Sequence, residues 1–411
     1  MLIHWIWLAT RPDMNDREKL AALEHFHDPE DIFFADAGTY EHIPGLSQTA
    51  IDALRDKNLL PAEQVLSECA RKKIHILTFV DGAYPTRLKN IADPPLVLYY
   101  KGTLPDLDGL PVIGVVGTRK ASVYGMTAAK RLGYQIGRCG GVVVSGAATG
   151  IDGVAMQGAL SADAPVIAIL GCGVDVVYPL SNKGLFADTE RHGCLISEFV
   201  PGTPPYKWNF PKRNRIISGI SDGVLVVEAP EKSGALITAR QALEQGRDVF
   251  AVPGNIDVSS CAGSNALLRD GAILAASGWD VIGEYQHLYP DKIRKETAPV
   301  RLTVSKEEMA EMPKVAQKAE LPHSSAEKGE TKKKKVIDNA DSSSYSDESK
   351  AIPQLTPVEQ AVMTQLTSGE RLVDDVIAAA GLPSGQILAA LTMLEVKGLV
   401  KTLPGRRITK K

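Results

Sequence analysis

Residues 201–219, PGTPPYKWNFPKRNRIISG, combine basic and aromatic side chains in one short segment. Cations bind phosphates and rings stack on bases, so this combination is typical of sites for single-stranded nucleic acid. The alternative is that the rings pack beneath the loop while the charges are solvated. The side chains concerned are the cations Lys207, Lys212, Arg213 and Arg215 and the rings Tyr206, Trp208 and Phe210.

A second group of candidates lies in GVVGTRKASVYG, residues 114–125, where an apolar run enters a glycine turn. The dinucleotide pattern Gly-x-Gly-x-x-Gly has a glycine where this chain has Arg119, and Lys120 follows it. A bulky cation there would crowd a dinucleotide's pyrophosphate, whereas a planar guanidinium suits a backbone phosphate arriving from outside. Amide groups at the start of the next helix can face the same anion. We therefore expect a turn that binds the phosphates of a strand.

A third group, SGAATGID at residues 145–152, follows the next apolar run. Ser145 and Gly146 form a second turn of small residues, and Asp152 falls near a helix N-terminus, where a carboxylate is favoured. Turns of this kind are common in Rossmann-like proteins. This turn therefore supports a phosphate-binding site only in combination with the first turn.

These segments must be positioned by a regular scaffold. Between residues 76 and about 285, apolar Val- and Ile-rich runs alternate with helical patterns, so we expect a Rossmann-like DNA-binding core at residues 76–290. Such alternation predicts a parallel, doubly wound, Rossmann-like α/β sheet with ligands at the carboxyl ends of its strands. We expect strands near 112–117, 141–146, 165–171, 193–197, 222–229 and 248–254, and helices near 125–139, 152–162, 182–192, 212–221 and 233–246.

The first 75 residues predict a small helical domain, SAM-like or helix-hairpin-helix-like. IPGLSQTAIDAL, residues 43–54, resembles the hairpin whose turn amides hold a DNA phosphate, but Ser47 replaces the usual second glycine. The alternative is a helical domain that merely packs. The opening MLIHWIWLA is too short to span a bilayer and has no basic start or cleavage site, so we expect a buried first helix.

Two further regions complete the chain. Residues 291–354 are polar and broken and predict a disordered linker, in which the lysines at 332–335 are either solvated or in contact with nucleic acid. Residues 355–411 predict three helices and a hairpin, a winged-helix pattern. The third of these helices has few cations, so packing against a protein and reading DNA both stay open.

Composition restricts the classes of function. The 411 residues carry a net charge of only −3, so any nucleic-acid partner must be met by a local basic patch. The five cysteines are scattered without metal spacing, which indicates reduced thiols and a cytoplasmic protein. There is no GxxxxGK[ST] phosphate loop and no Ser-His-Asp signature, and the eight histidines are dispersed.

Taken together, these segments resemble the bacterial DNA-processing protein A family (DprA, also called Smf). The resemblance covers about residues 84–283 and is dense and ordered. It is carried by YPTRLKNIADPPLVLYYKG, VVGTRKASVYG, SGAATGID, GCGVDVVYP, SEFVPGTPPYKWNFPKRNRIISGISDGVLVVEA and SGALITARQALEQGRDVFAVPG.

The resemblance implies a homodimeric binding protein that needs no cofactor. We expect no membrane partner, because the apolar opening of the chain is too short to span a bilayer. It implies binding of incoming single-stranded DNA during natural transformation, protection of that DNA, and loading of the RecA recombinase onto it in recombination. This chain has Met156 where the family usually has a histidine, so we infer that this histidine is not an indispensable catalytic group. The nucleic-acid-binding residues expected from the turns and the resemblance are Arg119, Lys120, Ser145, Gly146, Lys183, Lys207, Phe210, Arg213 and Asn214.

The rival hypothesis is an enzyme, a nucleotide phosphoribohydrolase on a related sheet. Those enzymes use a PGGxGTxxE motif, and the matching stretch here is SGALITARQ. Thr238 falls at the threonine, but Gln241 stands where the glutamate would be, so the acid–base carboxylate is missing. We therefore predict a protein that is not an enzyme and has no catalytic residues or metal site.

Overall fold

The computed structural model describes residues 1–295 and, near the C-terminus, residues 357–366, 371–380, 399–403 and 407–410 with the single residues 387, 390, 391 and 394. The chain divides into two compact units, Met1–Pro322 and His323–Lys411. The predicted linker lies outside the described residues, apart from its first five residues. Those five belong to the first unit, because Ile293 is buried and the Arg294 amide donates to the Cys139 carbonyl at 3.0 Å.

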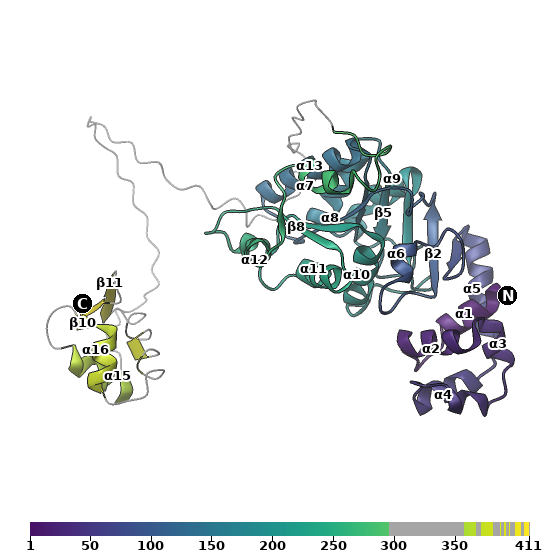
Figure 1. Cartoon of the computed structure of the whole chain (residues 1–411), viewed down its shortest axis with the longest axis horizontal. Helices are drawn as coiled ribbons and strands as arrows, with labels where there is room; N and C mark the ends of the chain where they lie inside the picture. The colour runs from purple at the N-terminus through teal and green to yellow at the C-terminus, as the bar shows by residue number, and fades with distance from the viewer. Residues whose placement is uncertain are drawn as a thin grey trace, which may run out of the picture. The chain divides into compact units, whose positions relative to one another are not determined.

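The first unit is built on a nine-stranded sheet with the order β1-β2-β6-β5-β4-β3-β7-β8-β9 (Figure 1). The strands from β6 to β9 in this order are parallel, as predicted, whereas β1 and β2 extend the sheet in antiparallel fashion. The sequence did not predict β1, β2 or β9. The bounds are β1 His75–Thr78, β2 Val97–Gly102, β3 Val112–Val116, β4 Val142–Ser145, β5 Val166–Ile169, β6 Cys194–Ser197, β7 Gly223–Val226, β8 Asp248–Ala251 and β9 Ile273–Leu274.

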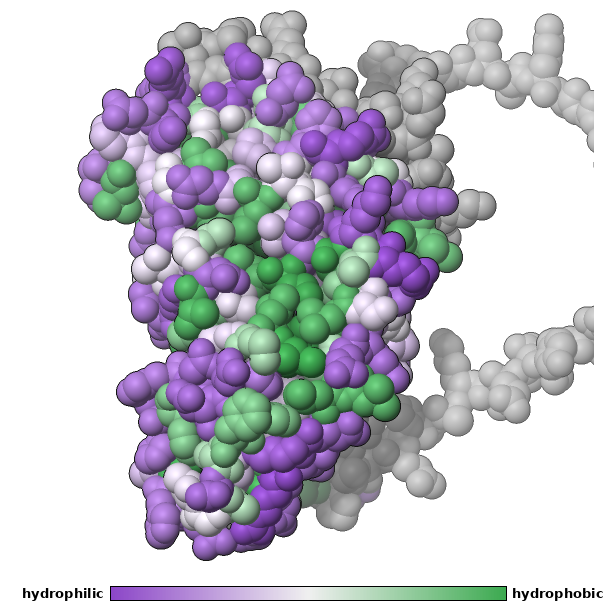
Figure 2. Space-filling view, turned by 90° about the vertical axis from the view of Figure 1, so that its right-hand side faces the viewer, coloured by the Kyte–Doolittle hydropathy of each residue, from purple (hydrophilic) through white to green (hydrophobic). Residues whose placement is uncertain are grey.

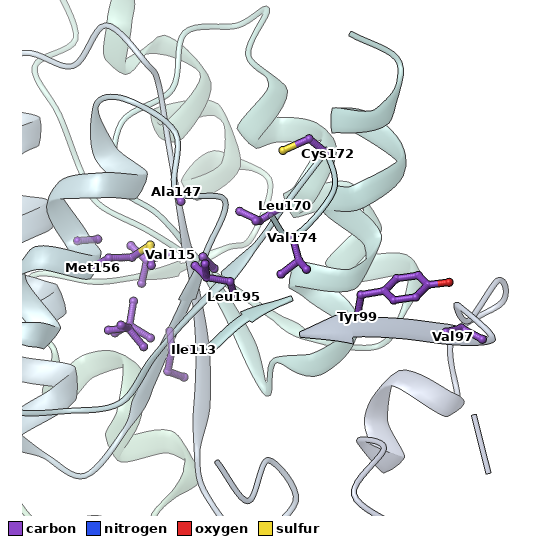
Figure 3. Close-up of a cluster of buried hydrophobic side chains, with 14 of the residues drawn as sticks. Val97, Tyr99, Ile113, Val115, Ala147, Met156, Leu170, Cys172, Val174 and Leu195 are labelled. Atoms are coloured by element: carbon purple, nitrogen blue, oxygen red, sulfur yellow. The ribbon is translucent and has the colours of Figure 1, made fainter. Parts of the chain in front are cut away.

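Helices cover both faces of this sheet, which is why its central strands are apolar on every side. Successive side chains of β3 enter different layers: Ile113 and Val115 join one buried cluster, and Val112 and Val116 join the other. Figure 3 shows part of the first layer, in which Val115, Met156 and Leu195 are among the clustered side chains. The helices are α6 Thr86–Lys89, α7 Val123–Arg138, α8 Ile151–Leu160, α9 Lys183–His192, α10 Asn209–Ile220, α11 Gly234–Glu244, α12 Ala262–Arg269 and α13 Trp279–Ile282, with short 3-10 turns at Leu180–Asn182, Ser259–Cys261 and Gly283–Tyr285.

The N-terminal helices pack directly on the edge of this sheet. Trp7 of α1 is fully buried, which confirms the predicted buried first helix, and the same cluster continues into Val97 and Tyr99 of β2. The described part of the chain contains no helix with the length and apolar run needed to cross a membrane. The bounds are α1 Leu2–Ala9, α2 Asp16–Phe26, α3 Pro29–Phe34, α4 Gln48–Arg55 and α5 Leu60–Lys72, with a 3-10 turn at Thr39–His42.

The hairpin turn before α4 is occupied from within the domain. Ser47 caps α4 by accepting from the Ala50 amide, and its own amide donates to Glu18 at 3.1 Å. That amide belongs to the group that would hold a phosphate in a DNA-binding hairpin. A carboxylate already fills the place of the phosphate, so this geometry favours the packing alternative.

The side of the molecule on which Figure 1 places α1, α3 and α5 carries some exposed apolar surface. Figure 2 shows an apolar area there, bordered by polar side chains. The N-terminal helices contribute large exposed apolar residues, namely Met1, Leu2, Phe34 and Leu60.

The second unit contains α15 Pro357–Gln365, α16 Val373–Ala380 and three strands in the order β10-β12-β11, with bounds Arg371–Leu372, Arg407–Lys410 and Val400–Leu403. The predicted third helix falls mostly outside the described residues. Ile387, Ala390, Leu391 and Leu394 are described as buried, at the spacing of one helix face.

Candidate nucleic-acid interface

A cleft of about 670 Å³ lies at the carboxyl ends of the parallel strands. Its walls come from the turn after β3, the loop that leads into α10, and the start of α11. A smaller hollow of about 40 Å³ adjoins it at the turn after β4. Seven of the nine predicted site residues line these two hollows: Arg119, Lys120, Gly146, Lys207, Phe210, Arg213 and Asn214.

The turn after β3 is bound by Glu228, a fully buried carboxylate two residues beyond the end of β7. Its side chain accepts from the Ser122 amide at 3.0 Å and from the Ser122 hydroxyl at 2.8 Å. Its carbonyl accepts from the Thr118 amide at 2.7 Å. Glu228 therefore fixes both ends of the loop that presents Arg119 and Lys120. Sequence reasoning did not select Glu228.

The turn after β4 interlocks with this first turn. Gly150 has φ +80°, and a Cβ there would clash with the Thr118 carbonyl oxygen. The Ile151 amide also donates to that oxygen at 3.2 Å. Only glycine satisfies this backbone and this close approach, so the second turn supports the position of Arg119.

Beneath the cleft, Arg213 and Asp152 form a buried charged floor. The Arg213 guanidinium donates to the Gly146 carbonyl at 3.0 Å and to the Ile169 carbonyl. Burial lowers the pKa of Arg213 to about 10, and the nearby Asp152 opposes that shift. Burial also raises the pKa of Asp152, although Arg213 and the amides of Gly117 and Gly146 act against it. Arg213 therefore connects the ends of β4 and β5 through hydrogen bonds, and its charge is largely used within the protein.

The Phe210 ring is half-buried between protein groups. The Arg119 guanidinium carbon lies 5.3 Å from its centroid and that of Arg213 lies 5.9 Å away. A Cβ on Gly171 would come within 2.9 Å of the same ring. Phe210 therefore positions Arg119 and is only partly available to a base.

Four exposed cations surround the cleft: Arg119, Lys120, Lys207 and Lys232. Within residues 1–295, none of them forms a salt bridge with a carboxylate. Asp152 is the one carboxylate among the described lining residues, and it is buried next to Arg213. Positive charge therefore gathers here although the whole chain is slightly acidic. Sequence reasoning missed Lys232, which stands just before α11 at the same sheet edge.

Helix N-termini also face this edge of the sheet. Ser122 caps α7 by accepting from the Gly125 amide at 3.0 Å, and Ser233 caps α11 by accepting from the Ala235 amide at 3.2 Å. The N-terminus of α7 already faces the buried Glu228 carboxylate, which accepts from the Ser122 amide. The start of α11 lines the cleft, so its partial positive end favours an anion there.

Two predicted site residues lie outside the linings. Ser145 is fully buried, and its hydroxyl donates to the Val115 carbonyl at 2.6 Å, so it joins β4 to β3. Lys183 is exposed at the start of α9. Its neighbour Asn182 donates to the carbonyls of Ala147 and Ala148 and so contacts the second turn.

The basic segment is divided between two sides of α10. Arg215 is buried and pairs with Glu198 at 2.7 Å, Asp93 at 3.1 Å and Asp16 at 3.3 Å. Lys212 pairs with Asp16 at 2.9 Å. Both cations join α10 to the N-terminal helices, so the prediction that they serve the nucleic-acid site is not supported by their positions.

The rival enzyme site is only half present in the cleft. Thr238 lines it, but Gln241 is not among its lining residues. The side-chain oxygen of Gln241 is buried and has no hydrogen-bond partner in the described part of the chain.

Comparison with known proteins shows what this chain resembles. The model of the family DNA recombination-mediator protein A matches residues 75–286, and that of the DprA winged helix domain matches residues 346–406. The second match confirms the predicted winged helix.

Curated relatives include DNA processing protein DprA of Bacillus subtilis, 43% identical over 221 residues, which cover 54% of this chain and 74% of the relative. Protein Smf of Synechocystis is 32% identical over 391 residues, covering 93% of this chain and 92% of the relative. Among solved structures, the X-ray structure of DNA processing protein A from Streptococcus pneumoniae has a TM-score of 0.62 and 34% identity, covering 69% of this chain and 98% of that one.

Proposed function

The chain belongs to the DNA recombination-mediator protein A family, DprA/Smf, and from this premise we propose that it binds single-stranded DNA independently of sequence. A role in DNA processing follows from the family. We propose further that the strand lies in the cleft at the carboxyl ends of the parallel strands.

The observation that carries the proposal is the group of four exposed cations around the cleft, which form no salt bridge within residues 1–295, together with the N-terminus of α11 and the glycine turns that line it. Phosphate contacts made by such groups contain no base information, so binding is expected to be independent of sequence. The aromatic side chains of the loop before α10 favour a single strand, because only unpaired bases expose their faces to rings.

Titration of single-stranded and double-stranded DNA at two salt concentrations tests this proposal. We expect tighter binding of the single strand, and a log affinity that falls with log salt by about 0.7 for each phosphate contact. Equal affinity for the duplex, or affinity that does not depend on salt, would contradict the proposal.

We further propose that the chain is a cytoplasmic homodimer that protects incoming DNA and loads the RecA recombinase onto it during natural transformation. Family membership supports these steps. Protection is tested by nuclease digestion of bound single strands. Loading is tested by the rate of RecA filament formation on single-stranded DNA with and without the chain, and no acceleration would contradict it.

We propose that the chain acts by binding and not by catalysis. The substitution of Gln241 for the glutamate of phosphoribohydrolases supports this view. Incubation with nucleoside monophosphates tests it, and release of free base would favour the enzyme.

A further inference from the structure

An exposed pair of stacked rings lies in the loop that leads into α10. The centroids of Tyr206 and Trp208 are 4.7 Å apart and their planes are inclined by only 7°. Tyr206 is 45% exposed and Trp208 is 69% exposed. Large rings are normally covered by other apolar groups, so a parallel pair left in water indicates a binding surface.

This pair is continuous with the cleft. Pro205 and Lys207, the neighbours of Tyr206 in the chain, both line the cleft, and Lys207 also stands directly before Trp208. A strand whose phosphates approach Lys207 therefore passes beside the rings.

The loop that carries the rings is held by the protein. The Gly202 amide donates to Asp175 at 2.8 Å, and the Gly173 amide donates to the Thr203 carbonyl at 2.9 Å. At the other end, the Asn209 amide donates to the Tyr206 carbonyl at 3.1 Å. Because the loop is already ordered, little conformational entropy is lost when a ligand stacks on it.

We infer that Trp208, backed by Tyr206, is a stacking platform for an unpaired base of the strand whose phosphates lie in the cleft. This inference rests on the proposed function. Tyr206 stacks on one face of Trp208, and because Trp208 is still 69% exposed, a base can add a third parallel layer. Phe210 is less suited to this role, because Arg119 and Gly171 already contact its ring.

Two oligonucleotides separate stacking on a base from contact with a phosphate. One is oligothymidylate, and the other is an abasic strand of the same length. In the full-length chain, Trp208→Ala is expected to weaken binding of oligothymidylate by about 5- to 150-fold, the range for one stacked base. Binding of the abasic strand and the salt dependence should stay unchanged, because no phosphate contact is lost.

A matched control is Phe34→Ala, which removes another largely exposed ring, 71% exposed, from the N-terminal helices. It should leave both affinities unchanged. Melting temperatures of both variants should stay close to that of the parent chain, because neither ring is buried.

A spectroscopic measurement reports on the platform directly. The chain has four tryptophans, all of them in the described part, and Trp208 is the exposed one, since Trp5 and Trp7 are buried and Trp279 is half-buried. Oligothymidylate should quench the emission of Trp208 more than the abasic strand does. Trp208→Phe keeps a ring, so it should retain most of the affinity while losing this quenching.

The outcomes are distinct. Unchanged affinity of Trp208→Ala for oligothymidylate, or equal losses on both strands, overturns the platform. If Arg119→Ala weakens binding and Trp208→Ala does not, the proposal that DNA binds in the cleft is supported and the proposal that a base stacks on Trp208 is wrong. If the reverse holds, the strand binds at the rings, and the proposed cleft fails alone.

Discussion

At the scale of single residues, Arg119 is an exposed cation that lies between two interlocked turns and packs against the Phe210 ring. Arg119→Ala should weaken binding of single strands of any sequence and reduce the slope of log affinity against log salt by about 0.7. Anisotropy titrations of homopolymeric and mixed-sequence oligonucleotides measure both quantities. Arg17→Ala removes the same charge from an exposed site on α2 and should change neither. An unchanged slope for Arg119→Ala would place the DNA elsewhere.

Phe210 can contribute both to DNA binding and to packing, and two substitutions at this position separate these contributions. Phe210→Ala should lower DNA affinity by about 1–3 kcal/mol if the ring stacks on a base or positions Arg119. It should also lower the free energy of unfolding. This loss should be smaller than that for a fully buried phenylalanine, which is about 3–5 kcal/mol. Phe210→Leu fills most of the volume without an aromatic face, so it should melt near the parent temperature and still bind weakly. Full affinity in Phe210→Leu would show that only packing matters.

Individual residues show which parts of this site can be predicted from the sequence and which cannot. The two turns and the basic loop were recognised because each follows an apolar strand run. Arg213 and Arg215 were grouped together because they are close in sequence. On a helix, two residues apart means about 200° of rotation, which sends Arg213 beneath the cleft and Arg215 toward the N-terminal helices. Lys232 was missed because it belongs to another turn, which only the folded sheet brings to the same edge.

At the scale of elements, Gly150 joins the second turn to the first. Gly150→Ala introduces a Cβ at φ +80° against the Thr118 carbonyl, so the turn that carries Arg119 must shift. We expect the free energy of unfolding to fall by about 1–3 kcal/mol, the usual cost of such backbone strain, together with a loss of DNA affinity. Denaturant unfolding and DNA titration measure the two effects.

Gly184→Ala is the matched control, because it lies in α9 with nothing within 4 Å of the added Cβ. It should leave DNA binding unchanged and stabilise the helix by up to about 1 kcal/mol. Equal behaviour of the two variants would contradict the interlocking of the turns.

A second property of elements is the ion cluster between α2 and α10. Burial alone would raise the pKa of Asp16, but Lys212 and then Arg215 bring it below its usual value. The stability contributed by Asp16 is therefore fully present above the unfolded pKa of about 3.9 and is lost as the pH falls through the lower folded pKa. Asp16→Asn should cost about 1–2 kcal/mol at pH 7, more than an exposed pair contributes.

Urea unfolding of the parent and Asp16→Asn chains at pH 7, 5 and 3 measures this dependence. The difference between them should shrink at the lowest pH. Asp257→Asn changes an exposed aspartate and should match the parent chain throughout. A difference that persists undiminished at pH 3 would mean that Asp16 acts through packing and not through its charge.

The elements also differ in how far the sequence predicts them. The six central strands are continuous Val- and Ile-rich runs because helices cover both of their faces, and that composition is visible without a structure. β1 pairs with β2, and β2 pairs with β6, both in antiparallel fashion, and β9 is only two residues long. Such pairing depends on distant segments, which a local pattern does not contain.

At the scale of the whole molecule, the N-terminal helices and the sheet behave as one folded body. Their buried cluster runs from Trp7 through Val97 and Tyr99 into the sheet, and Arg215 pairs across the same boundary. The sequence boundary near residue 75 therefore separates two patterns of composition and not two independent cores. A core cut at this boundary would expose apolar surface, so the natural fragment for study begins at residue 1.

The C-terminal winged helix belongs to a separate compact unit, and all described residues that line the cleft belong to the first unit. We therefore expect a chain of residues 1–295 to stay folded and to keep its affinity for single-stranded DNA within tenfold of the full chain, about 1.4 kcal/mol. Its salt slope should also be unchanged, because the four cations around the cleft are retained. Anisotropy titration of both proteins measures the affinity and the salt slope. We also expect the shorter chain to remain a dimer, and sedimentation measures its oligomeric state. A loss of more than tenfold with a smaller slope would mean that the winged helix contacts phosphates directly, and the assignment of binding to the cleft alone would be wrong.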